Sequence, residues 1–155
     1  DAALSSRRDI IFAFNHDYFS TGTGKSLFLG SRFSNGKVIA WDGDLVVHRD
    51  DIPLCLEGDD EFLGVSPSVS EDAVFVDLSQ NGCDVTAFKR EPKTDYEWSG
   101  PARVWSERIR DENGHVFAGL IDQLPLPARK IRAFDIDTPA DYEYALSLFG
   151  DYEHE

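Results

Sequence analysis

Residues 21–47 read TGTGKSLFLGSRFSNGKVIAWDGDLVV, and the order of features within them decides the fold. After a Gly/Thr loop, residues 25–33 predict a helix of roughly two or three turns from the apolar residues Leu27, Phe28, Leu29 and Phe33. Residues 37–41 (KVIAW) then predict a buried strand, which leads directly into Asp42-Gly43-Asp44. A loop, a helix and a strand with an acidic end indicate an α/β domain.

The rest of the chain alternates between strand and helix patterns. We expect strands at 8–15, 61–69, 72–79, 83–91, 98–109 and 131–136, and helices at 48–58, 115–124 and 138–150. Asn81-Gly82 indicates a hairpin. The last helix has the clearest start, with Thr138 as N-cap and Pro139 at the first helical position. These patterns predict a three-layer α/β domain with a mixed sheet.

Composition limits the classes of partner. The chain has 155 residues, 29 of them acidic and 15 basic, for a formal net charge of −14. A surface this negative repels phosphate backbones, so we expect no nucleic-acid partner. No apolar run is long enough to span a bilayer, and the first residues lack the order of a secretion signal. We therefore expect no membrane partner and a cytoplasmic location.

Gly24-Lys25-Ser26 matches the end of a nucleotide-binding P-loop, G-x-x-x-x-G-K-[ST]. The first glycine of that motif lets backbone N–H groups encircle phosphates, and Phe19 occupies its place here. A P-loop phosphotransferase is therefore disfavoured. The plainer alternative is a strand-to-helix loop in which the glycines relieve strain and Lys25 is solvated.

Acidic residues follow two predicted strands. Asp42 and Asp44 come at the carboxyl end of 37–41, and Asp135 and Asp137 flank Ile136 at the end of 131–136. Ligands of open α/β sheets bind outside the carboxyl ends of strands, and short carboxylates suit Mg²⁺. A turn rich in Asp and Gly is the alternative for either group alone. Together, the two groups predict one cation site.

Three segments resemble the nucleotidyltransferases that activate sugar phosphates and phosphocholine. Residues 21–47 are similar to the middle of that family, where a GTG or GTA loop contacts the nucleotide base and a strand ends in a GD pair whose Asp binds Mg²⁺. Residues 134–146 (FDIDTPADYEYAL) resemble the family's IDTPEDLE segment, which supplies the second metal ligand. Residues 85–104 resemble the central segment, which carries a basic residue and a Glu near the acceptor.

This resemblance implies a Rossmann-like fold of the GT-A type and a set of site residues. Asp44 and Asp137 would hold Mg²⁺, and Lys89 or else Arg90 would pair with the acceptor phosphate. Glu97 and Trp98 would contact the acceptor, either sugar hydroxyls or a choline-like cation; core packing is the alternative for Trp98. The nucleotide would lie against Gly22, Thr23, Gly24, Ser26 and Asp42.

The implied activity is Mg²⁺-dependent nucleotidyl transfer from a nucleoside triphosphate, with CTP or UTP favoured, to a sugar phosphate or phosphocholine. The partners would be that nucleotide and a small phosphorylated acceptor, and a homodimer is compatible with the class. Residues 1–155 would form a single domain that lacks the family's N-terminal GxGTR segment. That difference keeps a non-catalytic, transferase-like binding module open as the alternative.

Overall fold

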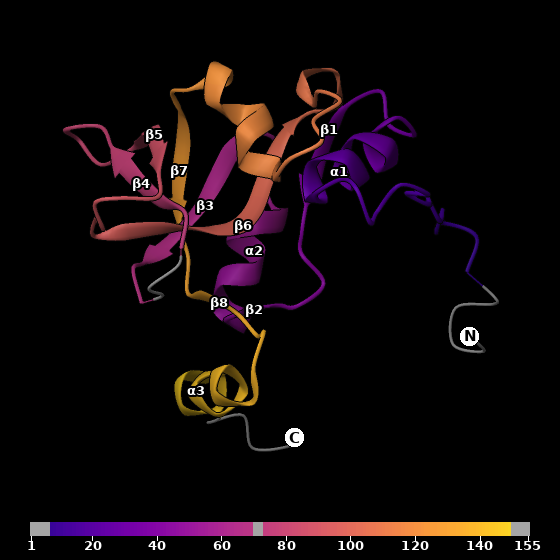
Figure 1. Ribbon diagram of the computed structural model, residues 1–155. Helices are drawn as coiled ribbons and strands as arrows, with labels where there is room; N and C mark the ends of the chain where they lie inside the picture. The colour runs from indigo at the N-terminus through magenta and orange to yellow at the C-terminus, as the bar shows by residue number, and fades with distance from the viewer. Residues whose placement is uncertain (1–6, 70–72, 150–155) are drawn as a thin grey trace.

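A six-stranded sheet lies at the centre of the computed structural model, which describes residues 7–69 and 73–149 (Figure 1). Its strand order is β1-β6-β3-β7-β5-β4. The strands are β1 (Lys37–Ala40), β3 (Phe62–Pro67), β4 (Phe75–Leu78), β5 (Asp84–Lys89), β6 (Tyr96–Trp105) and β7 (Leu126–Lys130). β3 and β7 run parallel and the other neighbouring pairs run antiparallel, which confirms the prediction of a mixed sheet.

Helices cover both faces of this sheet. Side chains alternate between faces along a strand, so the neighbours Phe62 and Leu63 enter two different cores. Leu63 packs in the core that includes α1 (Thr23–Ser31) and the 3₁₀ helix η3 (Val116–Gln123). Phe62 packs with Cys55 of α2 (Ile52–Leu56). The domain therefore has the predicted three layers.

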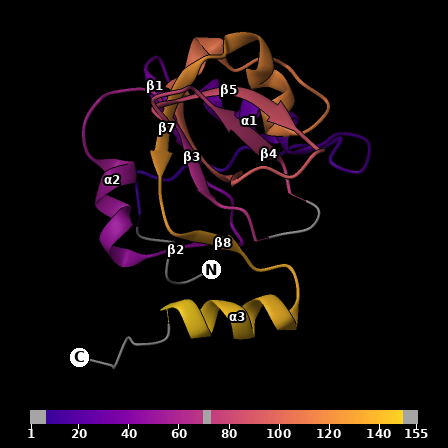
Figure 2. The same ribbon diagram turned by 90° about the vertical axis from the view of Figure 1, so that its left-hand side faces the viewer.

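A separate two-stranded ribbon lies beneath the main sheet. It pairs β2 (Leu45–Val47) with β8 (Ala133–Asp135) in antiparallel register. Helix α3 (Pro139–Phe149) lies against it (Figure 2), with the rings of Phe134 and Tyr144 4.9 Å apart. Short 3₁₀ helices follow β2 and β6, η1 (Arg49–Asp51) and η2 (Ser106–Arg108).

The start of α3 confirms the predicted cap. The Thr138 backbone N–H donates to Asp141 Oδ2 at 2.7 Å, and the Asp141 N–H donates to Thr138 Oγ1 at 3.3 Å. This reciprocal pair satisfies N–H groups that have no partner inside the helix. The side-chain hydrogen bond with Thr138, and to a lesser extent the backbone one, lowers the pKa of Asp141. The predicted end of the helix, Gly150, lies outside the described residues.

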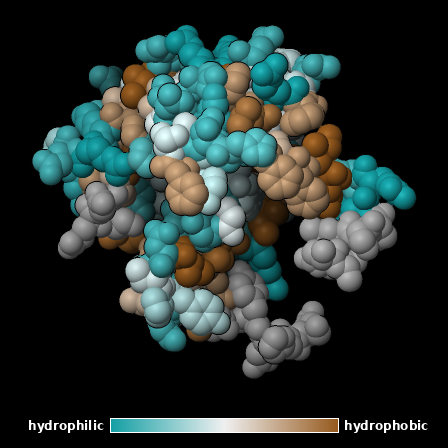
Figure 3. All heavy atoms as spheres, turned by 45° about the vertical axis from the view of Figure 1, so that its right-hand side comes forward, coloured by the Kyte–Doolittle hydropathy of each residue, from teal (hydrophilic) through white to brown (hydrophobic). Residues whose placement is uncertain are grey.

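The strand predicted at 8–15 is wrong. Within the described ranges no strand pairs with this segment, and Ile11, Phe12 and Phe14 are 65%, 67% and 71% exposed. Figure 3 shows apolar side chains on the side of the molecule where this segment lies. The β-branched and aromatic residues of this segment favour a strand. A strand forms, however, only where a neighbouring strand pairs with its backbone N–H and C=O groups.

Three other segments differ from expectation. Strand β1 lies at one end of the sheet order and is half-buried rather than buried, with Ile39 36% exposed. Residues 116–123 form a 3₁₀ helix, and residues 125–130 (PLPARK), whose prolines predict the end of that helix, include strand β7. None of the helices within 7–69 and 73–149 is long and apolar enough to cross a membrane.

Candidate active site

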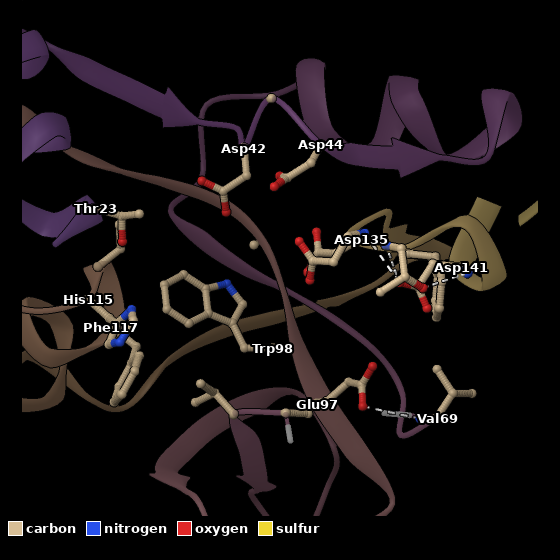
Figure 4. Close-up of a pocket in the computed structure, with 18 of the residues that line it drawn as sticks. Thr23, Asp42, Asp44, Val69, Glu97, Trp98, His115, Phe117, Asp135 and Asp141 are labelled. Carbon is tan, nitrogen blue, oxygen red and sulfur yellow. Dashed lines mark hydrogen bonds between the residues drawn. The ribbon is translucent and has the colours of Figure 1, made fainter. Parts of the chain in front are cut away.

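The acidic residues of two strand ends meet at one cleft. Asp42 and Asp44 lie in the turn between β1 and β2, and Asp135 is the last residue of β8. Leu45 lies opposite Asp135 in the ribbon, and the Ile136 N–H donates to the Asp44 carbonyl at 3.0 Å. Figure 4 shows the side chains of Asp42, Asp44 and Asp135 directed toward the same space. The predicted convergence of the two acidic groups is thus present in the fold.

Crowding of carboxylates changes their proton affinity. Loss of hydration at the cleft wall, and then repulsion from Asp44, Asp42, Asp137 and Glu97, raises the pKa of Asp135 from 3.8 to about 6. Partial burial and repulsion from Asp44 also raise the pKa of Asp42. Negative charge at this wall is therefore held against mutual repulsion, which a bound cation would relieve.

Gly100 makes room for the Asp42 carboxylate. It lies in the middle of β6 with a φ of +92°, a conformation that L side chains rarely adopt. A Cβ atom at Gly100 would come 3.0 Å from Asp42 Oδ2. This strand therefore needs glycine beside the acidic wall, a requirement that the sequence alone did not indicate.

The opposite wall of the cleft is aromatic. Trp98 of β6 and Phe117 of η3 meet edge to face with ring centroids 6.1 Å apart, and His115 stacks on Phe117 at 5.8 Å. The Arg90 guanidinium lies 5.5 Å from the centre of the Phe117 ring. Trp98 Nε1 is buried and has no hydrogen-bond partner in the described part of the chain. Sequence reasoning missed His115 and Phe117, because neither belongs to a recognisable motif.

The cleft between these walls has a volume of about 1180 Å³. Glu97, 7% exposed, lies at one end, where its Oε2 accepts the Val69 N–H at 3.1 Å. Thr23, at the start of α1, lines the other part near His115 (Figure 4). Of the predicted site residues, the cleft is lined by Thr23, Asp42, Asp44, Arg90, Glu97, Trp98 and Asp137.

Lys89 does not line the cleft. Its ammonium group pairs with Asp77, which lies in the neighbouring strand β4. Lys89 is the last residue of β5, whereas Arg90 lies just beyond the strand and lines the cleft. Of the two basic residues considered for the acceptor phosphate, the structure brings only Arg90 to the site.

The backbone of the glycine loop is already engaged by the protein. The Gly22 N–H donates to the Asn113 carbonyl at 2.5 Å, and the Gly24 N–H donates to the Gly114 carbonyl at 3.0 Å. A Cβ at Gly24 would lie 3.0 Å from the Gly114 oxygen, and one at Gly22 would be closer still. Gly22 and Gly24 do not line the cleft, and they allow close backbone contact with residues 111–114; their predicted contact with a nucleotide base stays a prediction.

Ser26 and Lys25 also have partners within the protein. Ser26 Oγ accepts from Asn15 Nδ2 at 3.1 Å, and Ser26 does not line the cleft. Lys25 is not simply solvated, because its Nζ pairs with Asp111 Oδ1 at 2.6 Å. Neither residue therefore lines the cleft.

The carboxylates that line this cleft would suit a divalent cation held by two of them. In the described ranges, no group of three His, Cys, Asp or Glu side chains is arranged to hold a metal ion. Mg²⁺ typically takes only one or two carboxylates from protein and fills its shell with water and substrate phosphates. Asp44 and Asp135, whose charges repel each other in this cleft, would supply those two carboxylates. Asp137, the metal ligand that the resemblance to nucleotidyltransferases implies, comes two residues after Asp135, the last residue of β8. It also lines the cleft.

Comparison with solved structures identifies the fold. The inositol-1-phosphate CTP transferase from T. maritima matches 91% of this chain with a TM-score of 0.65 and 17% identity, over 67% of its own length. The putative glucose-1-phosphate thymidylyltransferase from Bacillus anthracis matches 88%, with a TM-score of 0.66 and 14% identity, over 64% of its length. The chain has a nucleotidyltransferase-like fold.

A third match has the same character. The CTP:phosphocholine cytidylyltransferase from Streptococcus pneumoniae aligns with 87% of this chain at a TM-score of 0.61 and 16% identity, over 67% of its own length. The chain thus spans about two thirds of the length of these nucleotidyltransferases. No protein-family model and no curated protein matches the sequence.

Proposed function

We propose that this nucleotidyltransferase-like domain transfers a nucleotidyl group from a nucleoside triphosphate, CTP or UTP, to a sugar phosphate or phosphocholine. One observation carries the proposal: Asp42, Asp44 and Asp135 converge on a cleft whose opposite wall holds Arg90 and Trp98. The nucleotidyltransferase-like fold supports it, because the structural neighbours use CTP, UTP and related substrates.

The reaction needs no nucleophile from the protein. A phosphate oxygen of the acceptor attacks the α-phosphorus, the bond from that phosphorus to the bridging oxygen breaks, and pyrophosphate leaves with the electron pair. Catalysis of this kind rests on positioning and on neutralising phosphate charge. A bound Mg²⁺ would supply that neutralisation.

The residues of the two walls have separate tasks in this proposal. Asp44 and Asp135 would hold the cation, and Asp137, which also lines the cleft, would be available to it as a further carboxylate. Arg90 donates to the acceptor phosphate, as a planar guanidinium binds phosphate oxygens well. Glu97 and Trp98 orient the rest of the acceptor. Thr23, the member of the glycine loop that lines the cleft, contacts the nucleotide.

A pyrophosphate-release assay tests this function. The panel pairs CTP, UTP, dTTP and GTP with inositol 1-phosphate, glucose 1-phosphate and phosphocholine in the presence of Mg²⁺. We expect release with at least one pair, loss of release in Asp44→Asn, and retained release in the matched control Lys89→Gln. Release that is equal in the wild type and Asp44→Asn would refute the assignment.

A non-catalytic binding module is the second candidate, and one observation favours it. The Gly22 and Gly24 N–H groups already donate to the 111–114 turn. A module of this kind would bind nucleotide in the cleft without turning it over. Mg²⁺-dependent nucleotide binding with no pyrophosphate from any pair in the panel would establish the module instead of the enzyme.

A further inference from the structure

Asp44 and Asp135, the two carboxylates that share the acidic wall of the cleft, depend on a very short ribbon. Asp44 precedes β2 and Asp135 ends β8, and the ribbon pairs only Leu45 with Asp135, Val46 with Phe134 and Val47 with Ala133. Isolated two-stranded ribbons of this size are marginally stable. In the described ranges neither strand pairs with the six-stranded sheet. Its register is fixed by the packing of Leu45, Val47 and Ala133 in the core around Phe62, together with contacts at its ends.

A charged pair closes the end of the ribbon away from the cleft. The Arg132 side chain donates to Asp51 through Nε at 2.8 Å and through Nη2 at 2.7 Å, and the Arg132 backbone N–H adds a third bond at 2.8 Å. Asp51 is 8% exposed, and its pKa is lowered chiefly by the hydrogen bond from Arg132. Two-pronged Arg–carboxylate pairs are among the stronger and more directional contacts in proteins.

The pair connects to the ribbon directly. Arg132 comes immediately before β8, and its carbonyl accepts the His48 N–H at 2.8 Å, one residue after the end of β2. Asp51 is the last residue of η1, and His48 caps the start of that helix. The Asp51 N–H donates to the His48 carbonyl at 2.8 Å. A slip of one residue in this register would turn Asp135 to the opposite face of the ribbon.

We propose that Asp51 and Arg132 are positioning residues that hold Asp44 and Asp135 at the spacing a divalent cation requires. This inference rests on the proposed cation site, and it assigns a task to two residues that do not line the cleft. Partners behind metal ligands often change metal affinity by about 10-fold to 100-fold when they are replaced.

Terbium luminescence tests the role without any assay of activity. Tb³⁺, a cation that prefers oxygen ligands, is titrated into the protein and its emission is excited through Trp98 in the same cleft. Asp44→Asn defines the part of the signal that belongs to the cleft. The test variants are Asp51→Asn and Arg132→Lys. The lysine variant keeps the positive charge and the hydrogen bond from the backbone N–H of residue 132 to Asp51. Arg110→Gln is the matched control, because Arg110 pairs with Asp122 at 3.0 Å on the exposed surface.

We expect Asp51→Asn to weaken cleft binding of Tb³⁺ about tenfold, Arg132→Lys to weaken it by a smaller factor, and Arg110→Gln to leave it unchanged. Thermal unfolding of each variant identifies the temperature at which it is fully folded, and binding is compared there. Wild-type affinity in folded Asp51→Asn and Arg132→Lys overturns the positioning role alone, even if both unfold earlier. Tb³⁺ binding that Asp44→Asn leaves intact overturns the cation site itself, and the inference with it.

Discussion

The carbonyl of Asp44 accepts a hydrogen bond of 3.0 Å from the N–H of Ile136, which ties the start of β2 to the end of β8. This bond places the acidic ends of two segments that are far apart in the sequence side by side. The side chains of Asp44 and Asp135 consequently share one wall of the cleft. The chemistry that we propose depends on this relationship more than on any single motif.

The raised pKa of Asp135 predicts how stability depends on pH. Its pKa in the folded state, about 6, exceeds the ordinary value of 3.8. The folded state therefore holds more protons than the unfolded state between these values, so the contribution of Asp135 to stability falls as pH rises from about 4 to about 6. We expect Asp135→Asn to remove this decline, measured as the free energy of unfolding in urea at several pH values.

The same carboxyl group reports on cation binding. Carbon NMR of Asp135 should show titration near pH 6 without metal, and Mg²⁺ should move the midpoint lower because the cation favours the ionised form. Asp59, whose side chain pairs with Lys37 at 3.0 Å and does not line the cleft, serves as the control carboxylate. An Asp135 midpoint near 4 in the metal-free protein would contradict the crowded acidic wall.

Gly100→Ala should disturb both stability and the acidic wall. A left-handed backbone costs a residue with a Cβ atom about 1–2 kcal/mol, and the new Cβ would press on Asp42 Oδ2. We expect lower stability in urea and weaker Mg²⁺ binding. Gly43→Ala is the control in the same cleft, since a Cβ at Gly43 meets no atom within 4 Å. Equal stability of the two variants would show that the Gly100 conformation is not required.

Gly22→Ala tests what the glycine loop is for. The added Cβ would strike the Gly114 backbone, so we expect a loss of about 1–3 kcal/mol in the free energy of unfolding. Gly30→Ala, in the same helix with no atom within 4 Å, should instead be neutral or add up to about 1 kcal/mol. A Gly22→Ala protein with wild-type stability and lost nucleotide binding would support the predicted base contact of this loop.

Most elements could be predicted because their signals are local. The cap at Thr138 and the turn at Asn81-Gly82 depend only on residues next to each other in the sequence. Both occur at the predicted positions. Strand β7 was missed because Pro127 indicates the end of a helix, whereas its position beside β3 is set by contacts distant in sequence. The prediction of a strand at 8–15 was wrong because it rested on local residue preferences alone. No strand in the described ranges pairs with this segment.

The site was predictable in its acidic half. Asp42, Asp44 and Asp137 all line the cleft. Each follows a strand that the sequence pattern predicts, and ligands of α/β sheets bind at such strand ends. The aromatic wall was not predictable, because Phe117 lies in the 3₁₀ helix η3 and His115 immediately before it, and the packing of this segment depends on the whole fold. The choice between Lys89 and Arg90 also needed the structure, because it depends on which of the two lines the cleft.

That choice gives a prediction for the acceptor. Arg90→Gln should raise the KM for the phosphorylated acceptor about tenfold or more, because a hydrogen bond to a charged group contributes about 1.5–3 kcal/mol. Lys89→Gln should leave the KM close to that of the wild type, since Lys89 pairs with Asp77 outside the cleft. Steady-state kinetics with the active pair from the pyrophosphate panel measure both. A larger effect from Lys89→Gln would reverse the assignment.

Isothermal titration of CTP and UTP with and without Mg²⁺ shows whether the cleft binds a nucleoside triphosphate through a cation held by Asp44 and Asp135. We predict that Mg²⁺ strengthens binding to the wild type and that Asp44→Asn and Asp135→Asn lose this strengthening. Without Mg²⁺ the two variants should bind no more weakly than the wild type, because each has one negative charge fewer to repel the phosphates. Nucleotide binding that is the same with and without Mg²⁺, in the wild type and in both variants, would refute a cation site at Asp44 and Asp135.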